Sequence, residues 1–347
     1  MDRCVGIALV ALLRPFRRAR AWRALRSDAR IALLNTYGIG DTILISAIVA
    51  DLKAAYPSAR VVFFAGPSCS EAAALIPGVE VVAIPLLCPW RALRAIRREA
   101  FDLWIDCAPW PRINALLSFC ARAGFTVGFD APGQHRHYLY DRAARHGEVH
   151  EIENLRALLR VLGIPAGAAP ALVAGKADRG SPYAVLHLHA GGSRARWKEW
   201  PDAHWVALMD ALTADGTRVS LTGAARDRAR CLAVRGRCRR PGQVEVVAGE
   251  MSLAQTAALL RGARCVVSVD TGVMHLAAAL GCATIALHGA TSPRRWGGVG
   301  RKVVSLEADA RGPFLHHGFE RIRPPDMAAI KVEHVLREVA RARSRAE

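Results

Sequence analysis

The chain has 347 residues, which is more than one hydrophobic core usually organises, so two domains of ordinary size are expected. With 52% apolar and 22% charged residues, it can bury enough surface to offset its conformational entropy, which excludes a disordered protein and a small disulfide scaffold. Its formal net charge of +18 favours an anionic partner: a nucleic acid, an anionic membrane leaflet or a phosphorylated substrate.

Neither a membrane span nor an export signal is expected. The apolar run over residues 5–13 has roughly half the length of a membrane-spanning helix. Arginines follow it, where a signal peptide would have a small-residue cleavage site, so we expect a cytoplasmic protein. The nine cysteines form no C-x-x-C pair, which disfavours a zinc knuckle and predicts reduced, mostly buried thiols.

Residues 1–30 are predicted to form a basic N-terminal extension. One helical face gathers Leu9, Leu12, Leu13 and Phe16, and over residues 14–30 seven arginines face one acidic residue, Asp28. These arginines are Arg14, Arg17, Arg18, Arg20, Arg23, Arg26 and Arg30. Two interpretations stay open: a partly amphipathic arm that attaches to an anionic membrane surface, or a solvated extension.

From residue 31 on, short apolar runs rich in β-branched residues alternate with segments of helical period. In the first half, strands are predicted at 31–34, 61–65, 81–84 and 102–106. Continuous apolar strands are buried on both faces, which implies a parallel sheet covered by helices. A Rossmann-like domain is therefore predicted over residues 31–165.

Residues 163–170, Gly-Ile-Pro-Ala-Gly-Ala-Ala-Pro, break every regular pattern, and an interdomain linker is predicted over 166–182. The alternation then restarts, with predicted strands at 183–189, 218–222, 244–247, 264–269 and 284–287. A second Rossmann-like domain is predicted over 183–310, followed by a C-terminal helical segment over 311–347. The fold class is thus α/β, with two parallel-sheet domains facing a cleft, and ligands are expected at the carboxyl ends of the strands.

The first motif lies in the turn between a strand and a helix at residues 35–42. Gly38 and Gly40 begin a G-x-G-x-x-G pattern, but Ile43 occupies the third glycine position, so a dinucleotide site is poorly supported. Asp41 has two interpretations. Its carboxylate can cap the helix that follows, or it can act as a general base at the edge of the cleft.

The second motif follows the strand at 183–189. Small residues in the turn at Gly191, Gly192 and Ser193 let backbone N–H groups approach an anion, and Lys198 supplies a full charge to a phosphate. Pro201 suits the first position of a helix. The alternative interpretation is a glycine turn with solvated cations.

The third motif is an Asp270-Thr271-Gly272 turn between a strand and an alanine-rich helix, whose N-terminus is an anion site. An aspartic protease needs two such turns, and this chain has one, so that function is disfavoured. His275, one turn into the helix, contacts a phosphate or is a structural histidine. The same alternatives hold for His187 and His189, which lack neighbours at metal-ligand spacing.

Taken together, Gly40-Asp41, Lys198-x-Trp200-Pro201 and residues 270–281 resemble glycosyltransferase family 9, the ADP-heptose:lipopolysaccharide heptosyltransferases. The resemblance covers residues 31 to about 300. It implies the GT-B fold and an inverting transfer of heptose from ADP-heptose onto a lipopolysaccharide-core or related glycolipid acceptor. No metal ion and no other cofactor is implied, and the nucleoside diphosphate leaving group would be stabilised by a lysine and a helix N-terminus.

The resemblance also assigns roles. Asp41 aligns with the proposed catalytic base, and Lys198 with the lysine that holds the donor diphosphate. The diphosphate-binding residues would be Gly191, Gly192, Ser193, Asp270, Thr271, Gly272 and His275, and Asp227 would contact the donor ribose. The second domain would hold the nucleotide sugar and the first domain the acceptor. Ala47 and Ala290 stand where many members have proline.

An acceptor loop is a candidate within residues 130–150, through Arg136, His137 and Arg142; the alternative is a basic exposed loop. Expected partners are the nucleotide-sugar donor, a phosphorylated glycolipid acceptor and the anionic inner-membrane surface, with peripheral attachment on its cytoplasmic face. Nucleic acid is not expected, because no recognition helix, RNP-like strand or arginine–aromatic platform is present. Two alternatives remain: a glycosyltransferase of the same fold with another donor or acceptor, and a non-catalytic nucleotide-sugar-binding protein.

Overall fold

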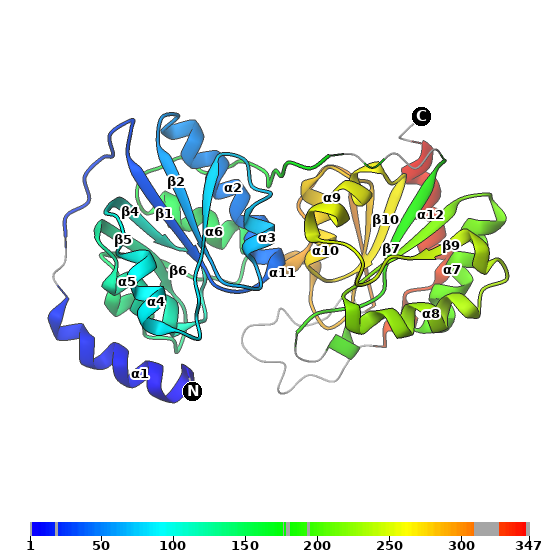
Figure 1. The fold of residues 1–347 in the computed structure, drawn as a ribbon, viewed down its shortest axis with the longest axis horizontal. Helices are drawn as coiled ribbons and strands as arrows, with labels where there is room; N and C mark the ends of the chain where they lie inside the picture. Colours follow the sequence, from blue (N-terminus) through cyan, green and yellow to red (C-terminus); the bar gives the residue numbers. More distant parts are fainter. Residues whose placement is uncertain are drawn as a thin grey trace. The chain divides into compact units, whose positions relative to one another are not determined.

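The computed structural model describes residues 2–17, 20–175, 177, 181–192, 195–308 and 326–344. The chain divides into two units, Met1–Ala171 and Leu172–Glu347, and the division falls inside the predicted linker. Figure 1 shows one parallel sheet with its helices in each unit.

The first unit contains six parallel strands in the order β3-β2-β1-β4-β5-β6. They are β1 (Arg30–Asn35), β2 (Arg60–Ala65), β3 (Val79–Ala83), β4 (Phe101–Asp106), β5 (Ala123–Asp130) and β6 (Arg142–Arg145). The register pairs Ile31 with Val61 on one side and with Leu103 on the other. Every residue of β1 after the first is buried, as expected for a central strand covered on both faces.

The sequence did not predict β5 and β6. β5 contains Gly124 and Gly128, which interrupt its apolar pattern, and a side chain at Gly128 would clash with the Tyr140 ring. Glycine is therefore required there by a close approach, although it weakens the strand signal. β6 has four residues, Arg-Ala-Ala-Arg, which carry no apolar run.

Helices α2 (Ile39–Ala55), α3 (Ser70–Ala73), α4 (Pro89–Ile96), α5 (Arg112–Cys120) and α6 (Glu151–Arg160) accompany this sheet. On one face, α4 and α5 pack over Ala32, Leu34 and Trp104. Phe64 stacks on Trp104 with ring centroids 4.9 Å apart. Because side chains alternate along a strand, Ile31 and Leu33 are buried on the opposite face.

The N-terminal segment packs onto the first unit instead of leaving it. Helix α1 (Asp2–Leu13) lies against α5, where Val10 joins a cluster with Leu139 and Tyr140. Farther along, Arg17 and Arg20 both form ion pairs with Asp141, at 3.5 and 3.6 Å. The ring of Trp22 lies 5.1 Å from that of Phe125, and Arg14 lies over the Tyr138 ring. Arg18 lies outside the described residues.

The segment that leaves the first unit is held on α2. The Asp51 carboxylate accepts hydrogen bonds from the backbone N–H groups of Gly167 and Ala168, at 3.1 and 2.9 Å. The Ser46 hydroxyl accepts another from the N–H of Ala171, at 3.0 Å. Residues 167–171 are therefore part of the first unit.

The second unit contains six parallel strands in the order β12-β11-β10-β7-β8-β9. They are β7 (Tyr183–His187), β8 (Arg218–Thr222), β9 (Val244–Val246), β10 (Cys265–Val269), β11 (Thr284–His288) and β12 (Val303–Glu307). Counted from the first strand of each unit, both sheets have the order 3-2-1-4-5-6 of a Rossmann fold. The predicted pair of Rossmann-like α/β domains is confirmed.

The helices of this unit are α7 (Asp202–Ala214), α8 (Arg228–Gly236), α9 (Leu253–Gly262), α10 (Gly272–Ala279), α11 (Pro293–Trp296) and α12 (Val332–Ser344). Trp200 and Trp205 are fully buried, in perpendicular contact with ring centroids 5.0 Å apart. The Trp200 indole N–H donates to the Ile330 carbonyl at 2.9 Å, which ties α12 to the core. Of the predicted segment 311–347, residues 311–325 and 345–347 lie outside the described residues.

Candidate functional site

In the second unit, the strand order reverses between β7 and β10, and ligands of such sheets bind where the order reverses. The two motifs that follow these strands meet there. The Lys198 ammonium donates a hydrogen bond to Asp270 Oδ2 at 3.0 Å, although 72 positions separate the two residues. The lysine and the Asp-Thr-Gly turn therefore form one cluster.

Asp270 is buried, and its carboxylate also accepts a hydrogen bond from the Thr291 hydroxyl. Burial alone would raise the pKa of Asp270, but the Lys198 ammonium, His288 and the Thr291 hydroxyl hold that pKa well below its usual range. The carboxylate is therefore ionised at neutral pH, and it fixes the position of the ammonium.

Helix α10 begins directly after Asp270. Thr271 is the N-cap residue, with extended backbone, and its side chain makes no capping hydrogen bond. The first N–H groups of a helix lack intrahelical acceptors, so an anion is favoured there. His275, in the first turn, is buried and near enough to Asp270 to lower its pKa. A fixed cation beside a helix N-terminus is suited to a phosphate.

The glycine turn after β7 is exposed. Gly192 has a φ of 81°, in the left-handed region that favours glycine, and nothing lies within 4 Å of where a Cβ would be. Gly191 is equally open. Ser193 lies outside the described residues. The phosphate-binding role of this turn stays a prediction.

Asp227 lies at the carboxyl end of β8, before α8. Its Oδ2 accepts a hydrogen bond from the Ala224 N–H at 2.8 Å, and its Oδ1 lies 3.9 Å from His189 Nδ1. The contact with a donor ribose stays a prediction. His187 accepts or donates a hydrogen bond to the Thr222 hydroxyl at 3.0 Å, and burial lowers the pKa of His187 to about 4. This histidine is therefore neutral at pH 7.

A network beside Lys198 was not predicted. The next residue, Glu199, forms an ion pair with Arg230, which also pairs with Asp202 at 2.7 Å. Burial would raise the pKa of Glu199, but His189 and Arg230 lower it to about 2. Glu199 stands within the predicted motif, whereas Arg230 is an ordinary helical arginine in the sequence. Only the fold brings them together, where they brace the segment that carries Lys198.

In the first unit, the strand order reverses between β1 and β4, and Asp41 follows β1. The N-cap of α2 is Gly38, with a φ of 83°, so Asp41 lies in the first turn and is not the N-cap residue. A Cβ at Gly38 would clash with the Asp41 carboxylate, so glycine is needed there. Burial and then the Asp41 carboxylate raise the pKa of Tyr37 well above its usual range. Asp41 itself is half-buried.

The predicted acceptor residues are not gathered on one exposed loop. Arg136 is fully buried, in an ion pair with Asp106, and it also donates to the Ala108 carbonyl and to the Tyr140 hydroxyl. The alternative of a basic exposed loop is wrong for this residue, because its guanidinium is buried and binds groups inside the unit. From these contacts we expect a structural role for Arg136 and not one in acceptor binding.

The other two candidates are accessible. His137 Nδ1 lies 2.8 Å from Asp130 Oδ1, and both side chains are partly exposed. Arg142 donates to the Val161 carbonyl at 2.6 Å. An acceptor role for these two residues stays a prediction.

The described residues offer neither a metal-binding cluster nor a membrane-spanning helix. They contain no group of three or more His, Cys, Asp or Glu side chains arranged to hold a metal ion, and metal independence stays a prediction. Within the same residues, none of the helices has the length and apolar character needed to cross a bilayer.

Comparison with known proteins gives a family match. The model described as "Glycosyltransferase family 9 (heptosyltransferase)" matches residues 90–314. This range contains Lys198 and the whole Asp-Thr-Gly block, together with α4 and α5 of the first unit.

Named relatives agree with the family match. "Lipopolysaccharide heptosyltransferase 1" of Pseudomonas aeruginosa is 41% identical over 134 residues, which cover 38% of this chain and 36% of that protein. The match therefore spans little more than a third of that relative. "Lipopolysaccharide heptosyltransferase 2" of Salmonella typhimurium is 24% identical over 331 residues, covering 86% of this chain and 92% of that protein.

A solved structure agrees in fold. The Escherichia coli ADP-heptose lps heptosyltransferase II superposes with a TM-score of 0.77 at 20% identity, over 91% of this chain and 99% of the other. The GT-B fold class is therefore confirmed.

Proposed function

The chain belongs to glycosyltransferase family 9, and from this premise we propose that it is an inverting glycosyltransferase. Its donor would be ADP-heptose, and its acceptor a lipopolysaccharide-core or related glycolipid. The names of its relatives support heptose as the sugar and lipopolysaccharide as the acceptor class. The observation that carries the proposal is the ion pair of Lys198 with Asp270 beside the N-terminus of α10.

That ion pair is suited to a departing diphosphate. When the bond between the anomeric carbon and the diphosphate oxygen breaks, the electron pair leaves with the nucleoside diphosphate. The ammonium of Lys198 and the first N–H groups of α10 would stabilise that charge where it develops. Asp270 keeps the ammonium in place before the donor arrives, so little reorganisation is needed.

Asp41 would act on the acceptor. Its carboxylate would take the proton of the acceptor hydroxyl as that oxygen attacks the anomeric carbon from the side opposite the leaving group. The first turn of α2 and the glycine at position 38 hold the carboxylate at the carboxyl end of β1. The assignment predicts an effect on turnover without an effect on donor binding.

The acceptor implies a place of action. We propose peripheral attachment to the anionic cytoplasmic face of the inner membrane, supported by the net charge of +18. Arginines of residues 1–30 would contribute, although Arg17 and Arg20 already pair with Asp141.

The test has two stages. Calorimetry of the full chain with ADP, UDP and GDP asks whether a nucleoside diphosphate binds and which base is preferred. Mass spectrometry then follows transfer from ADP-heptose onto a delipidated lipopolysaccharide-core acceptor. Failure of the folded protein to bind any nucleoside diphosphate would overturn the proposal. Binding of ADP-heptose without transfer to any acceptor would favour the non-catalytic sugar-nucleotide-binding protein.

A further inference from the structure

Helix α4 has an outward face that the proposed reaction does not use. Its inward side chains, Ala92 and Ile96, are buried in the core beside Trp104. Its outward side chains include Trp90, which is 73% exposed, and the turn before the helix presents Leu87, which is 97% exposed. We call the exposed set the α4 face. It consists of Leu87, Trp90, Arg91, Leu93, Arg94, Arg97 and Arg98.

Such exposure needs a reason. The described residues include ten exposed large apolar side chains, and three of them, Leu87, Trp90 and Leu93, lie within seven positions. Single exposed apolar residues are normal, but grouped ones mark an interaction surface. Three other tryptophans, at positions 104, 200 and 205, are completely buried. The fold can therefore bury indole rings, and the exposure of Trp90 is a particular feature of α4.

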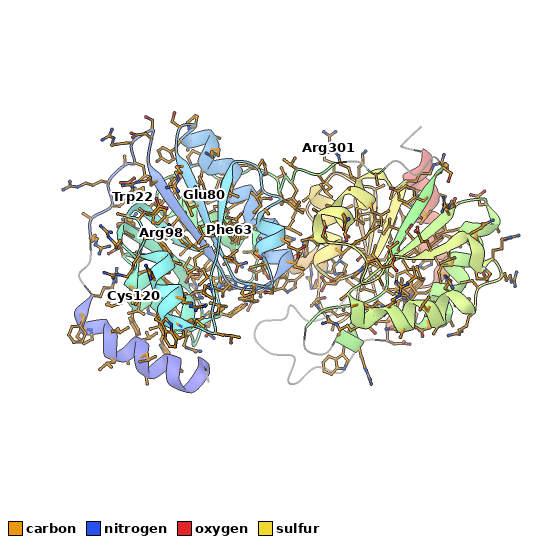
Figure 2. All side chains as sticks on the ribbon, in the orientation of Figure 1. Trp22, Phe63, Glu80, Arg98, Cys120 and Arg301 are labelled. Carbon is orange, nitrogen blue, oxygen red and sulfur yellow. The ribbon has the colours of Figure 1, made fainter. Side chains whose placement is uncertain are left out.

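Four arginines surround these apolar side chains. All four are exposed, and within the described part of the chain Arg91, Arg94 and Arg98 form no ion pair. Arg97 donates to the Cys120 carbonyl at 2.9 Å, which fixes the end of α4 on α5. Glu99, the acid next to them, is already paired with Arg60. The side chains of Arg98 and Cys120 are labelled in Figure 2, on one side of the first unit.

Apolar and basic side chains share one face of α4. Positions 90, 93, 94 and 97 are spaced i, i+3, i+4 and i+7, so Trp90 and Leu93 share a helix face with Arg94 and Arg97. A tryptophan and leucines among arginines match the boundary between lipid headgroups and acyl chains. There, indole rings lie at headgroup level and guanidinium groups meet phosphates. A nucleic acid would use the arginines but leave Leu87 in water.

We propose that the α4 face docks on the surface of an anionic phospholipid bilayer. The docking takes its purpose from the proposed function, because a lipid-linked acceptor lies in that surface, but binding itself needs no acceptor. The face is separate from the basic N-terminal extension, in which Arg17 and Arg20 pair with Asp141 and Arg14 lies on Tyr138. The guanidinium groups of Arg14, Arg17 and Arg20 thus already have partners, whereas those of Arg91, Arg94 and Arg98 form no ion pair among the described residues and stay available for lipid phosphates.

The first experiment measures sedimentation of the full chain with phosphatidylglycerol-containing vesicles and with neutral phosphatidylcholine vesicles, neither of which contains an acceptor. Arg91→Glu/Arg94→Glu should lower affinity for the anionic vesicles by at least about tenfold. Arg218→Glu/Arg240→Glu, an equal charge change on exposed arginines of the second unit, is the matched control and should leave most of the binding intact. Equal losses in the two double variants would reduce the effect to net charge and overturn the proposal.

The apolar part is tested by Trp90→Ser/Leu93→Ser. This variant should bind anionic vesicles several-fold more weakly, and its remaining binding should fall more steeply as salt rises past about 0.15 M, because only screened charge contacts are left. Unchanged affinity and unchanged salt dependence would show that neither Trp90 nor Leu93 enters the interface, against the proposal. Circular dichroism melting of each variant confirms that the fold is retained.

Transfer assays separate this surface from an acceptor subsite and from the proposed function. The α4 variants should keep wild-type rates on a delipidated, water-soluble acceptor and lose rate on the same acceptor embedded in anionic vesicles. Equal loss on both acceptors would make α4 part of an acceptor subsite, and the docking proposal would be wrong. If the wild type transfers to neither acceptor, the proposed function fails, while the vesicle measurements still decide the docking proposal.

Discussion

Each unit has an ion pair whose carboxylate lies at the carboxyl end of the fourth strand along the chain of that unit. The two pairs differ in solvent exposure and in the number of further hydrogen-bond partners of the cation. In the first unit, Asp106 at the end of β4 pairs with Arg136, and both side chains are fully buried. In the second, Asp270 follows β10 and pairs with Lys198, whose side chain is 17% exposed. Arg136 has further partners in Ala108 and Tyr140, whereas Lys198 donates to Asp270 alone among the described residues.

This difference separates a structural pair from one that can bind a ligand. A fully buried guanidinium whose terminal nitrogens bind Asp106, Ala108 and Tyr140 is closed to a substrate, and its removal leaves a buried carboxylate without its cation. An ammonium held by one carboxylate and reached by solvent keeps free donors for a phosphate. Position in the fold alone does not decide function, because the two carboxylates occupy the same place in sheets of the same strand order, while their cations come from different loops.

The largest effect is expected at a third carboxylate, Asp41, which lies across the strand-order reversal from Asp106. Asp41→Asn should lower the transfer rate by about two to four orders of magnitude, because a general base acts in the chemical step. Donor affinity from calorimetry should stay within error of the wild type. Normal turnover by the folded variant would leave Asp41 as a residue of the first helical turn without a catalytic role.

The next largest effect is expected for Lys198→Met. Removing the ammonium should cut kcat/KM on the order of 10²- to 10³-fold, since the charge meets the diphosphate as it leaves. ADP should also bind more weakly, because ground state and transition state both carry phosphate charge. Steady-state kinetics and calorimetry with ADP measure the two effects. Wild-type ADP affinity would contradict the assignment of Lys198 to the diphosphate.

Arg136→Met should act on stability, not on the reaction. It leaves Asp106 buried without its cation, which costs about 3 to 5 kcal/mol of unfolding free energy. Thermal and urea unfolding measure this, and the rate per folded molecule should be unchanged. Tyr140→Phe, which removes a hydroxyl that donates to Asp106 at 2.6 Å, provides the milder version if Arg136→Met does not fold. A lower rate per folded molecule would return Arg136 to the acceptor site.

The smallest effect concerns pH. The folded-state pKa of Asp270 lies below its ordinary value, so this residue adds stability above about pH 4 that is lost as the pH falls below it. Asp270→Asn should lower the unfolding free energy at pH 7 by roughly 1 to 3 kcal/mol. The variant should also lose less stability than the wild type between pH 5 and pH 3. Parallel melting curves over this range would contradict the depressed pKa.

The strands and turns that carry the motifs were predictable because their signals are local. Residues 31–34 are apolar throughout and residues 265–267 are Cys-Val-Val, and such short apolar runs indicate strands buried on both faces. The Asp-Thr-Gly turn and Lys198 were placed correctly at the carboxyl ends of strands. Their contact across 72 positions follows from the Rossmann strand order, in which the first and fourth strands are neighbours.

The burial of Arg136 was not predictable, because sequence pattern treats an arginine between polar residues as exposed. Its partner Asp106 ends a predicted strand and carries no mark of burial. The ion pair of Glu199 with Arg230 was not predicted for the same reason, because 31 positions separate the motif residue from an ordinary helical arginine. Long-range pairing of charges depends on which loops meet, and no period in the sequence encodes that.

Helix α2 holds the start of the connector between the two units. Its Asp51 and Ser46 side chains accept hydrogen bonds from the backbone N–H groups of Gly167, Ala168 and Ala171. Up to Ala171, the connector is therefore restrained by α2. Asp51 and Ser46 lie on the same helix whose first turn bears Asp41. One helix therefore both positions this carboxylate and holds the start of the connector.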